Sequence, residues 1–491
     1  MSSASQAIVI GSGIAGLAVS IRLAVKGHAV TVFEANDYPG GKLTAFEQEG
    51  YRFDAGPSLF TLPALVDELF TLAGKKPADH FAYHRLDESC RYFWEDGTRL
   101  KGWSEPQQFA AEVEGVLGEP AAHVNAHLDR ARLIHESTAR IFMERSLHKA
   151  GTWLSKDVVK ALAHVPKLGL FQSMDAVNRR RIKHPKLVQL FNRYATYNGS
   201  NPYSAPGILN VIPHLEMGIG TYFPKGGMHS ITKQLYGLAH ELGVTFHFGQ
   251  AVSEIVVERK TAIGVRTGKQ FHPADLVVSN MDVVPTYRKL MPAQKAPEKT
   301  LRQERSSSAL IFYWGINREF PELGLHNILF SDDYADEFRH LFELKRMGND
   351  PTIYLNITSK QQASDAPPGH ENWFVMVNAP HHEGQLTPEE IHRVRAVVLA
   401  KLKRMLGTDV ERCIATENLL TPADIQARTS SHLGALYGAA SNDRMAAFLR
   451  HPNFSRKIDN LYFCGGSAHP GGGIPLCLLS ARIVDELVAA N

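Results

Sequence analysis

The sequence predicts an α/β protein in which a doubly wound parallel sheet is assembled from both ends of the chain. Residues 6–10 form a short apolar run typical of a buried strand, and a glycine-rich turn and an amphipathic helical pattern follow it as far as Gly27. Residues 28–33 form a second apolar run, and residues 460–464 a third that is again followed by glycines and a helical pattern. The 491 residues, 44% of them apolar, are enough for more than one domain.

The first glycine-rich turn reads Gly11-Ser-Gly-Ile-Ala-Gly16. Gly11 permits a tight turn, Gly13 lets the backbone approach a pyrophosphate, and Gly16 lets the helix pack closely on the strand. Ile14 and Ala15 fall in the first helical turn, where free N–H groups and partial positive charge face an anion. These residues are therefore predicted to bind the diphosphate of a dinucleotide.

The second apolar run ends on Glu34, eighteen positions after Gly16. A carboxylate at this place accepts hydrogen bonds from ribose hydroxyls, and it would repel a 2′-phosphate. The order of strand, glycines, helix, strand and acid is typical of a Rossmann-like unit. The predicted nucleotide is FAD or NAD rather than NADP.

Residues further downstream decide between these two nucleotides. Tyr38-Pro-Gly-Gly-Lys42 follows the acid, and a stretch ending in Gly56-Pro-Ser58 comes soon after. This arrangement resembles the FAD-binding fingerprint of the amine oxidase and phytoene desaturase superfamily, although Lys42 stands where Arg is usual and gives a point charge in place of a planar fork. The resemblance implies FAD as cofactor, with Gly41, Lys42, Gly56, Pro57 and Ser58 at its site.

The C-terminal loop, residues 465–475, has five glycines in eleven residues and precedes a helical pattern over residues 476–490. It resembles the flavin-binding signature of bacterial carotenoid desaturases. The resemblance places Gly466 at the phosphate and ribityl chain, and Gly473, Ile474 and Pro475 near the isoalloxazine ring. In the same family a valine that corresponds to Val252 contacts the adenine.

Taken together, these motifs resemble the bacterial phytoene and carotenoid desaturase family over nearly the full length. The resemblance implies a GR2-type flavoprotein with a discontinuous α+β substrate or cap domain. We expect residues 1–75, 215–300 and 440–491 to form the FAD-binding domain, and residues 76–214 and 301–439 to form a substrate-binding and membrane-associating domain. The first insertion is mainly helical in pattern, and an apolar tunnel is expected between cap and flavin.

The composition limits the kinds of partner that the protein is expected to bind. Lys and Arg number 53 against 50 for Asp and Glu, a formal charge of +3, and no nucleic-acid motif accompanies the basic residues. The four cysteines lack metal-ligand spacing, so we expect reduced thiols, no metal and a cytoplasmic location. Residues 7–19 are predicted to be the nucleotide site rather than a signal peptide. No run of eighteen apolar residues predicts a membrane-spanning helix.

Peripheral attachment to the inner face of the cell membrane is a further expectation. Residues 156–171 mix apolar positions with Lys156, Lys160 and Lys167, a composition that suits an anionic lipid surface. Pro166 is predicted to interrupt this helix, and packing of the stretch on a domain core is the alternative.

The resemblance implies desaturation of a polyene, with hydride transfer to the flavin and loss of a proton. The electrons would pass to oxygen or a quinone, since the sequence has no second nucleotide motif in context. Asp157 is the candidate for proton transfer, with His214, Glu216 and Tyr197 as further possibilities.

Residues 191–203 resemble the corresponding region of late, (1-hydroxy)carotenoid 3,4-desaturases, and their Asn and Tyr side chains could meet an end-group hydroxyl. The alternatives are a phytoene desaturase, a carotene isomerase and a flavin amine oxidase. The last usually has an acidic residue after the C-terminal glycine, where this chain has Gly465-Gly-Ser-Ala-His469.

Overall fold

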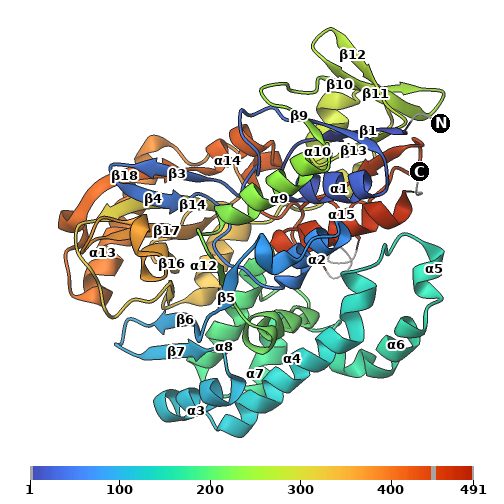
Figure 1. Ribbon diagram of the computed structural model, residues 1–491. Helices are drawn as coiled ribbons and strands as arrows, with labels where there is room; N and C mark the ends of the chain where they lie inside the picture. Colours follow the sequence, from blue (N-terminus) through green and yellow to red (C-terminus); the bar gives the residue numbers. More distant parts are fainter. Residues whose placement is uncertain (1–3, 444–448, 489–491) are drawn as a thin grey trace.

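The computed structural model describes residues 4–443 and 449–488, and it contains two sheets that organise two domains (Figure 1). The first domain has a five-stranded, wholly parallel sheet in the order β19-β13-β1-β2-β9. Its strands come from three separated stretches of the chain: β1 (Gln6–Ile10), β2 (Ala29–Phe33), β9 (Thr245–His247), β13 (Leu276–Ser279) and β19 (Leu461–Phe463). The predicted α/β class is confirmed.

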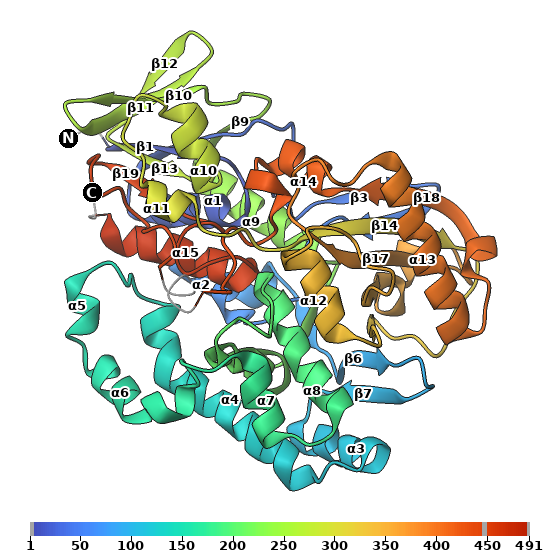
Figure 2. The same ribbon diagram turned by 180° about the vertical axis from the view of Figure 1, so that it is seen from behind.

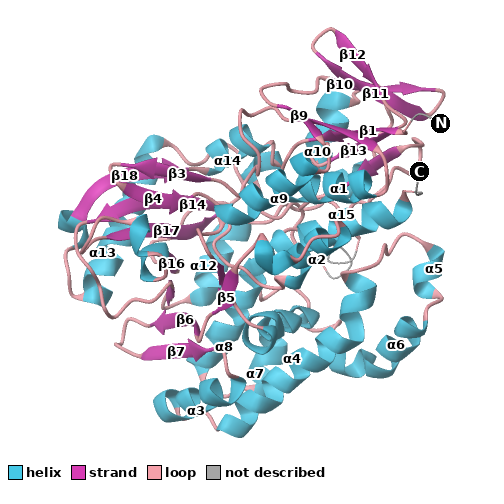
Figure 3. Ribbon diagram, in the orientation of Figure 1, coloured by secondary structure: helices cyan, strands magenta, loops and turns pink. Residues whose placement is uncertain are grey.

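Alternation along β1 explains how this sheet is covered. Ala7 and Val9 face a helical layer, whereas Ile8 and Ile10 face the opposite side. The helical layer consists of α1 (Ile14–Val25), α2 (Ala64–Leu72), α9 (His229–Glu241) and α15 (Ile474–Leu487). The other side carries an antiparallel sheet of β10 (Glu254–Glu258), β11 (Thr261–Thr267) and β12 (Gln270–Pro273), seen above β1 in Figure 3. Residues 489–490 of the predicted C-terminal helix lie outside the described residues.

The second domain is built on a seven-stranded sheet in the order β18-β14-β17-β16-β15-β6-β7. The strands that contain residues 309–314 and 373–377 pair within it, where Trp314 lies opposite Trp373 and both side chains are fully buried. The members are β6 (Glu88–Phe93), β7 (Arg99–Trp103), β14 (Ser308–Ile316), β15 (His326–Leu329), β16 (Ile353–Ile357), β17 (Glu371–Ala379) and β18 (Ile414–Leu420). Helix α13 (Pro388–Leu406) packs on one face.

Helices from the first insertion form the other part of this domain, at the bottom of Figures 1 and 2. They are α3 (Pro106–Leu117), α4 (Ala121–Phe142), α5 (Ala150–Trp153), α6 (Lys156–Leu168), α7 (Met174–Arg181) and α8 (Pro185–Asn192). The insertion also contributes β5 (Tyr83–Arg85), β6 and β7. Strand β6 pairs in parallel with β15, more than 230 residues later in the chain, so the two insertions share one sheet.

The prediction that Pro166 interrupts its helix is wrong. Helix α6 continues through Pro166 to Leu168 and ends at Gly169, whose φ is +71°. Proline removes the N–H that would bond to the carbonyl of Leu162. Leu162 is 63% exposed, so water can reach that side of the helix and satisfy the carbonyl.

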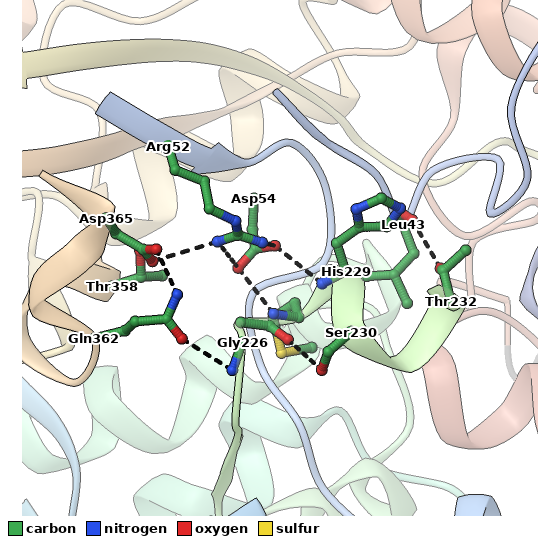
Figure 4. A network of polar contacts seen from close by, with 12 residues as sticks. Leu43, Arg52, Asp54, Gly226, His229, Ser230, Thr232, Thr358, Gln362 and Asp365 are labelled. Carbon is green, nitrogen blue, oxygen red and sulfur yellow. Dashed lines mark hydrogen bonds and ion pairs between the residues drawn. The ribbon is translucent and has the colours of Figure 1, made fainter. Parts of the chain in front are cut away.

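A polar network joins the two domains (Figure 4). Asp54, at the end of β4 (Tyr51–Asp54), accepts hydrogen bonds from the N–H groups of Met228 and His229 at the start of α9. Arg52 forms ion pairs with Asp54 and with Asp365 of the second domain, at 2.8 and 3.3 Å. The hairpin of β3 (Ala45–Gln48) and β4 is thereby held between the two sheets.

The remaining short elements connect these parts. They are β8 (Tyr222–Pro224), α10 (Val283–Pro285), α11 (Glu298–Leu301), α12 (Tyr334–Phe342) and α14 (Pro422–Thr429). Among the described residues, none of the helices combines the length and the apolar character needed to cross a bilayer.

Candidate active site

One cavity of about 940 Å³, lined by described residues of both domains, extends along the cradle and the second sheet. Every predicted cofactor residue except Gly16 lines it: Gly11, Gly13, Ile14, Ala15, Glu34, Gly41, Lys42, Gly56, Pro57, Ser58, Val252, Gly466, Gly473, Ile474 and Pro475. Three regions that are far apart in sequence, residues 11–58, Val252 and residues 466–475, therefore form one wall, as a dinucleotide cradle requires.

Gly16 lies directly behind this wall. A Cβ atom added to Gly16 would lie 2.1 Å from the carbonyl oxygen of Gly11, well inside van der Waals contact. Gly11 itself has φ +92°, a conformation that favours glycine. The close packing of α1 on the turn therefore depends on glycine at position 16.

Glu34 is buried at the end of β2 and holds the turn in place. Its Oε2 accepts hydrogen bonds from the Ser12 N–H and hydroxyl at 2.7 and 2.9 Å. Its Oε1 accepts from the Asn36 N–H and side-chain amide, both at 2.9 Å. A ribose hydroxyl that binds Glu34 would have to replace one of the two side-chain donors.

The double glycine brings a second loop against the first. A Cβ atom on Gly41 would lie 3.4 Å from the Cα of Gly13, and one on Gly40 would lie 2.5 Å from the carbonyl oxygen of Leu43. Gly56 is equally constrained, because its Cβ would come within 1.8 Å of the carbonyl oxygen of Lys42. Glycine at these three positions therefore lets neighbouring segments of the protein pack closely against one another.

Lys42 lines the cavity, but its ammonium group donates to the carbonyl oxygens of Ala435 and Leu436, at 3.3 and 2.9 Å. Burial lowers the pKa of Lys42, and Asp282 opposes this shift. The structure thus places the charge against a loop that precedes the C-terminal signature.

The C-terminal loop ends at α15, whose first residue is Ile474. Gly473 has φ +100°, and a Cβ on Gly472 would lie 2.8 Å from the Cα of Tyr437. The glycines at the N-terminus of α15 thus line the cavity, with Tyr437 packed against Gly472. Two glycine-lined helix N-termini, those of α1 and α15, suit a diphosphate and a flat ring, so the residues present fit FAD.

Apolar side chains of the second domain form much of the remaining wall. They come from α4, the residues after it, the turns around residues 208–215, and the sheet: Phe142, Met143, Leu147, Ile208, Leu209, Val211, Ile212, Leu215, Ile311, Ile328 and Met376. An apolar wall of this extent favours an apolar ligand beside the cradle.

A buried polar group interrupts the apolar wall. Glu216, which is 1% exposed, lies in the π-helical turn His214–Ile219 and accepts hydrogen bonds from the hydroxyls of Tyr194, at 2.9 Å, and Tyr197. Arg193 Nη2 lies 3.7 Å from Glu216 Oε2. Burial raises the pKa values of Tyr194 and Tyr197 well above their usual range, so both remain protonated donors.

A second polar chain reaches from the cradle to the sheet. The hydroxyls of Ser58 and Tyr354 lie 2.7 Å apart, and the Tyr354 hydroxyl lies 2.8 Å from His326 Nδ1. Burial, with a contribution from Arg193, lowers the pKa of His326 to about 3, so this imidazole is neutral. Ser58, Tyr354 and His326 all line the cavity.

The structure does not bring Asp157 to the cavity. Its carboxylate lies in the first turn of α6 and pairs with Arg145 at 3.2 Å and Arg140 at 3.6 Å. His214 is also absent from the cavity wall, whereas Glu216 and Tyr197 belong to it. The sequence predicted no role for Arg193, because it belongs to no recognisable motif or spacing. Among residues 4–443 and 449–488, no three His, Cys, Asp or Glu side chains gather as a metal site.

Comparison with known proteins agrees with this geometry. The family model described as "Flavin containing amine oxidoreductase" matches residues 14–486. The chain is 53% identical over 483 residues to a 1-hydroxycarotenoid 3,4-desaturase of Flavobacterium sp. (strain P99-3), covering 98% of this chain and 99% of the relative. It is 36% identical to a 4,4'-diapolycopene oxygenase of Methylomonas sp, covering 99% and 98%.

Solved structures share the fold. A putrescine oxidase variant matches with a TM-score of 0.62 at 14% identity, covering 99% of this chain and 98% of its own. An oxidoreductase from Methanosarcina mazei matches with a TM-score of 0.64 at 17% identity, covering 98% and 100%. The family expected from the glycine motifs is confirmed: the chain belongs to the flavin-containing amine oxidoreductases and is an FAD-dependent oxidoreductase.

Proposed function

We propose that the protein is a carotenoid desaturase that introduces a C=C bond into a late, 1-hydroxylated carotenoid at the 3,4 position. The observation that carries this proposal is the apolar cavity wall directly beside the FAD cradle. The relative of the same length at 53% identity is a 1-hydroxycarotenoid 3,4-desaturase, which supports the same substrate class. A phytoene desaturase and a carotene isomerase are the alternatives that also need a polyene cavity.

In the proposed reaction the substrate loses a hydride and a proton, and a single C–C bond becomes a double bond. FAD supplies the hydride acceptor when bound. The glycine turns and Glu34 hold the dinucleotide, while the apolar wall orients the polyene and excludes water. Positive charge on the substrate spreads along its conjugated chain, so the reaction places small demands on an acid or base. We propose oxygen or a quinone as the final electron acceptor.

The test is anaerobic incubation of the FAD-loaded protein with liposomes that contain 1-hydroxylycopene, lycopene, γ-carotene or phytoene. We expect flavin bleaching and a product with longer-wavelength absorbance for the hydroxylated substrate. Admission of oxygen or of a quinone then identifies the acceptor by the rate of flavin recovery. Bleaching by amines only, or by no carotenoid, would contradict the proposal. Geometric conversion without added conjugation would identify an isomerase.

We further propose that the protein contacts the inner face of the cell membrane through the α5–α6 surface, which we define as Trp153, Leu154, Val159, Leu162 and Phe171. Leu154 and Phe171 are 87% and 73% exposed, and several exposed large apolar side chains on one short stretch of chain indicate a site of interaction with a partner or a membrane. Lys156, Lys160 and Lys167 lie in the same helix and favour anionic lipids.

The position of this surface suits a lipid-dissolved substrate. Phe142, Met143 and Leu147 line the cavity and immediately precede α5 in the chain. Helix α6 also packs against α4, with Ala161 in contact with the cluster around Ile141 and Leu147. The exposed apolar side chains and the cavity wall therefore belong to one continuous segment.

A further inference from the structure

The cavity contains an ion pair that a hydrocarbon does not require. Arg193 and Glu216 both line it, and they are only 6% and 1% exposed. Removal of two charges from water is costly, and replacement of such a pair by apolar residues is often neutral or stabilising. An ion pair that is maintained within an apolar binding wall therefore indicates a ligand with a polar group.

The surroundings of the pair are aromatic. The guanidinium carbon of Arg193 lies 5.6, 4.9 and 5.1 Å from the ring centres of Tyr92, Tyr194 and Tyr197. Arg193 also donates to the hydroxyls of Tyr197, at 3.3 Å, and Tyr92, at 3.4 Å. We call these five residues, Tyr92, Arg193, Tyr194, Tyr197 and Glu216, the Arg193–Glu216 cluster. Three rings fix the guanidinium, so little entropy is lost when a ligand binds to the cluster.

Hydrogen bonding in this region is incomplete. Within the described part of the chain, Arg193 Nε, the Tyr334 hydroxyl and the Asn198 side-chain oxygen are buried and have no partner. All three residues line the cavity. Glu216 Oε1 accepts only from Tyr194, which leaves acceptor capacity on the carboxylate. Both donors and acceptors therefore remain to be satisfied, and buried groups of this kind usually have a partner.

The charge of the cluster limits what that partner is. Glu216 is compensated by Arg193, so the pair is neutral overall. An ammonium or carboxylate ligand would leave one buried charge uncompensated, which is unfavourable. A neutral hydroxyl has one donor and two lone pairs, and it matches the mixed set of groups.

We infer that the Arg193–Glu216 cluster binds the end-group hydroxyl of the carotenoid and thereby selects hydroxylated over hydrocarbon ends. This inference rests on the proposed desaturase function. The hydroxyl donates to the Glu216 carboxylate and accepts from Arg193 Nε or the Tyr334 hydroxyl, two donors that have no partner among the described residues. An analogue that lacks the hydroxyl leaves these polar groups unsatisfied, which is the basis of strong discrimination in buried sites.

The first test varies the substrate and leaves the protein intact. Flavin reduction by the FAD-loaded protein is followed anaerobically with lycopene, 1-hydroxylycopene and 1-methoxylycopene in the same liposomes. A hydrogen bond to a charged group predicts that kcat/KM is about ten- to hundredfold higher for the hydroxylated compound than for lycopene. The methoxy compound has no O–H to donate and should lose most of this preference.

The second test uses Glu216→Gln and Tyr197→Phe, with Tyr203→Phe as the matched control. Tyr203 lies in the same segment but does not line the cavity. We expect the ratio of kcat/KM for 1-hydroxylycopene over lycopene to fall toward one in the first two variants and to stay at the wild-type value in the control. If Glu216→Gln fails to retain FAD, Tyr197→Phe, which removes one oxygen atom, carries the comparison.

The outcomes separate the two proposals. Desaturation of lycopene and its hydroxy derivative at equal rates would overturn the hydroxyl site and leave the desaturase function standing. A wild-type substrate ratio in both Glu216→Gln and Tyr197→Phe would also overturn the hydroxyl site. Equal loss of activity toward both substrates would overturn it too, because such a loss indicates a structural or proton-transfer role for these residues. Failure of every carotenoid to reduce the flavin would instead contradict the proposed function.

Discussion

Replacement of Glu34 by Gln tests the nucleotide cradle at its most connected residue. The carboxylate accepts four hydrogen bonds, two from Ser12 and two from Asn36. Glutamine keeps the shape but replaces one acceptor oxygen by an NH2 donor. In either orientation of the amide, the backbone N–H of Ser12 or of Asn36 then faces a donor. The Gly11–Gly16 turn, which is predicted to bind the pyrophosphate, therefore loses part of the hydrogen bonding that holds it to Glu34.

The expected effect follows from the energy of one such contact. A hydrogen bond to a charged group contributes about 1.5–3 kcal/mol, and 1.4 kcal/mol corresponds to tenfold in affinity, so the Kd for FAD should rise about ten- to hundredfold. Titration of FAD fluorescence quenching with the cofactor-free protein measures this change. Glu258→Gln, at an exposed position at the end of β10, is the control and should bind like the wild type. An unchanged Kd in Glu34→Gln would refute the assignment of Glu34 to the cofactor site.

Two further predictions address the cradle packing and the membrane surface. Gly16→Ala should lower both Tm and FAD retention, because its Cβ would lie 2.1 Å from the Gly11 oxygen. Gly237→Ala, at a position in α9 with open space around it, is the control and should be stabilised by up to about 1 kcal/mol. Calorimetry that gives Gly16→Ala the higher Tm of the two would contradict the packing argument. The double variant Leu154→Glu/Leu162→Glu should lose most of its flotation with anionic liposomes while it retains FAD and Tm, and undiminished flotation would rule out the α5–α6 surface as the contact.

The cofactor side of the site was predictable from sequence because its constraints are local. Gly11, Gly13 and Gly16 lie within six residues and act through the conformation and close approach of the backbone. Glu34 follows at a spacing set by one helix and one strand. Each motif therefore determines its own local backbone conformation. When the parallel sheet forms, all of the motifs lie at one cavity.

The substrate side was less predictable because its residues meet only in the tertiary structure. Glu216 reaches Arg193 and Tyr197 through the packing of a π-helical turn against residues 193–198, and no periodicity marks that contact. Asp157 is a further case. The resemblance to the desaturase family suggested proton transfer, but the carboxylate lies in the first turn of α6, pairs with two arginines and does not line the cavity.

The charges around the cavity bear on the choice between a polyene and an amine. The described lining residues include fewer carboxylates than cationic side chains: Glu34, Glu216 and Asp282 against Lys42, Arg193, Lys289, Arg428 and Arg450. Glu34 already accepts hydrogen bonds from protein donors, the charge of Glu216 is compensated by Arg193, and the Asp282 carboxylate accepts from the Val284 N–H. An excess of positive charge favours a diphosphate and disfavours a cationic substrate. The surplus of cationic side chains and the neutral cluster in an apolar wall therefore favour the proposed hydroxylated polyene over an amine as the substrate.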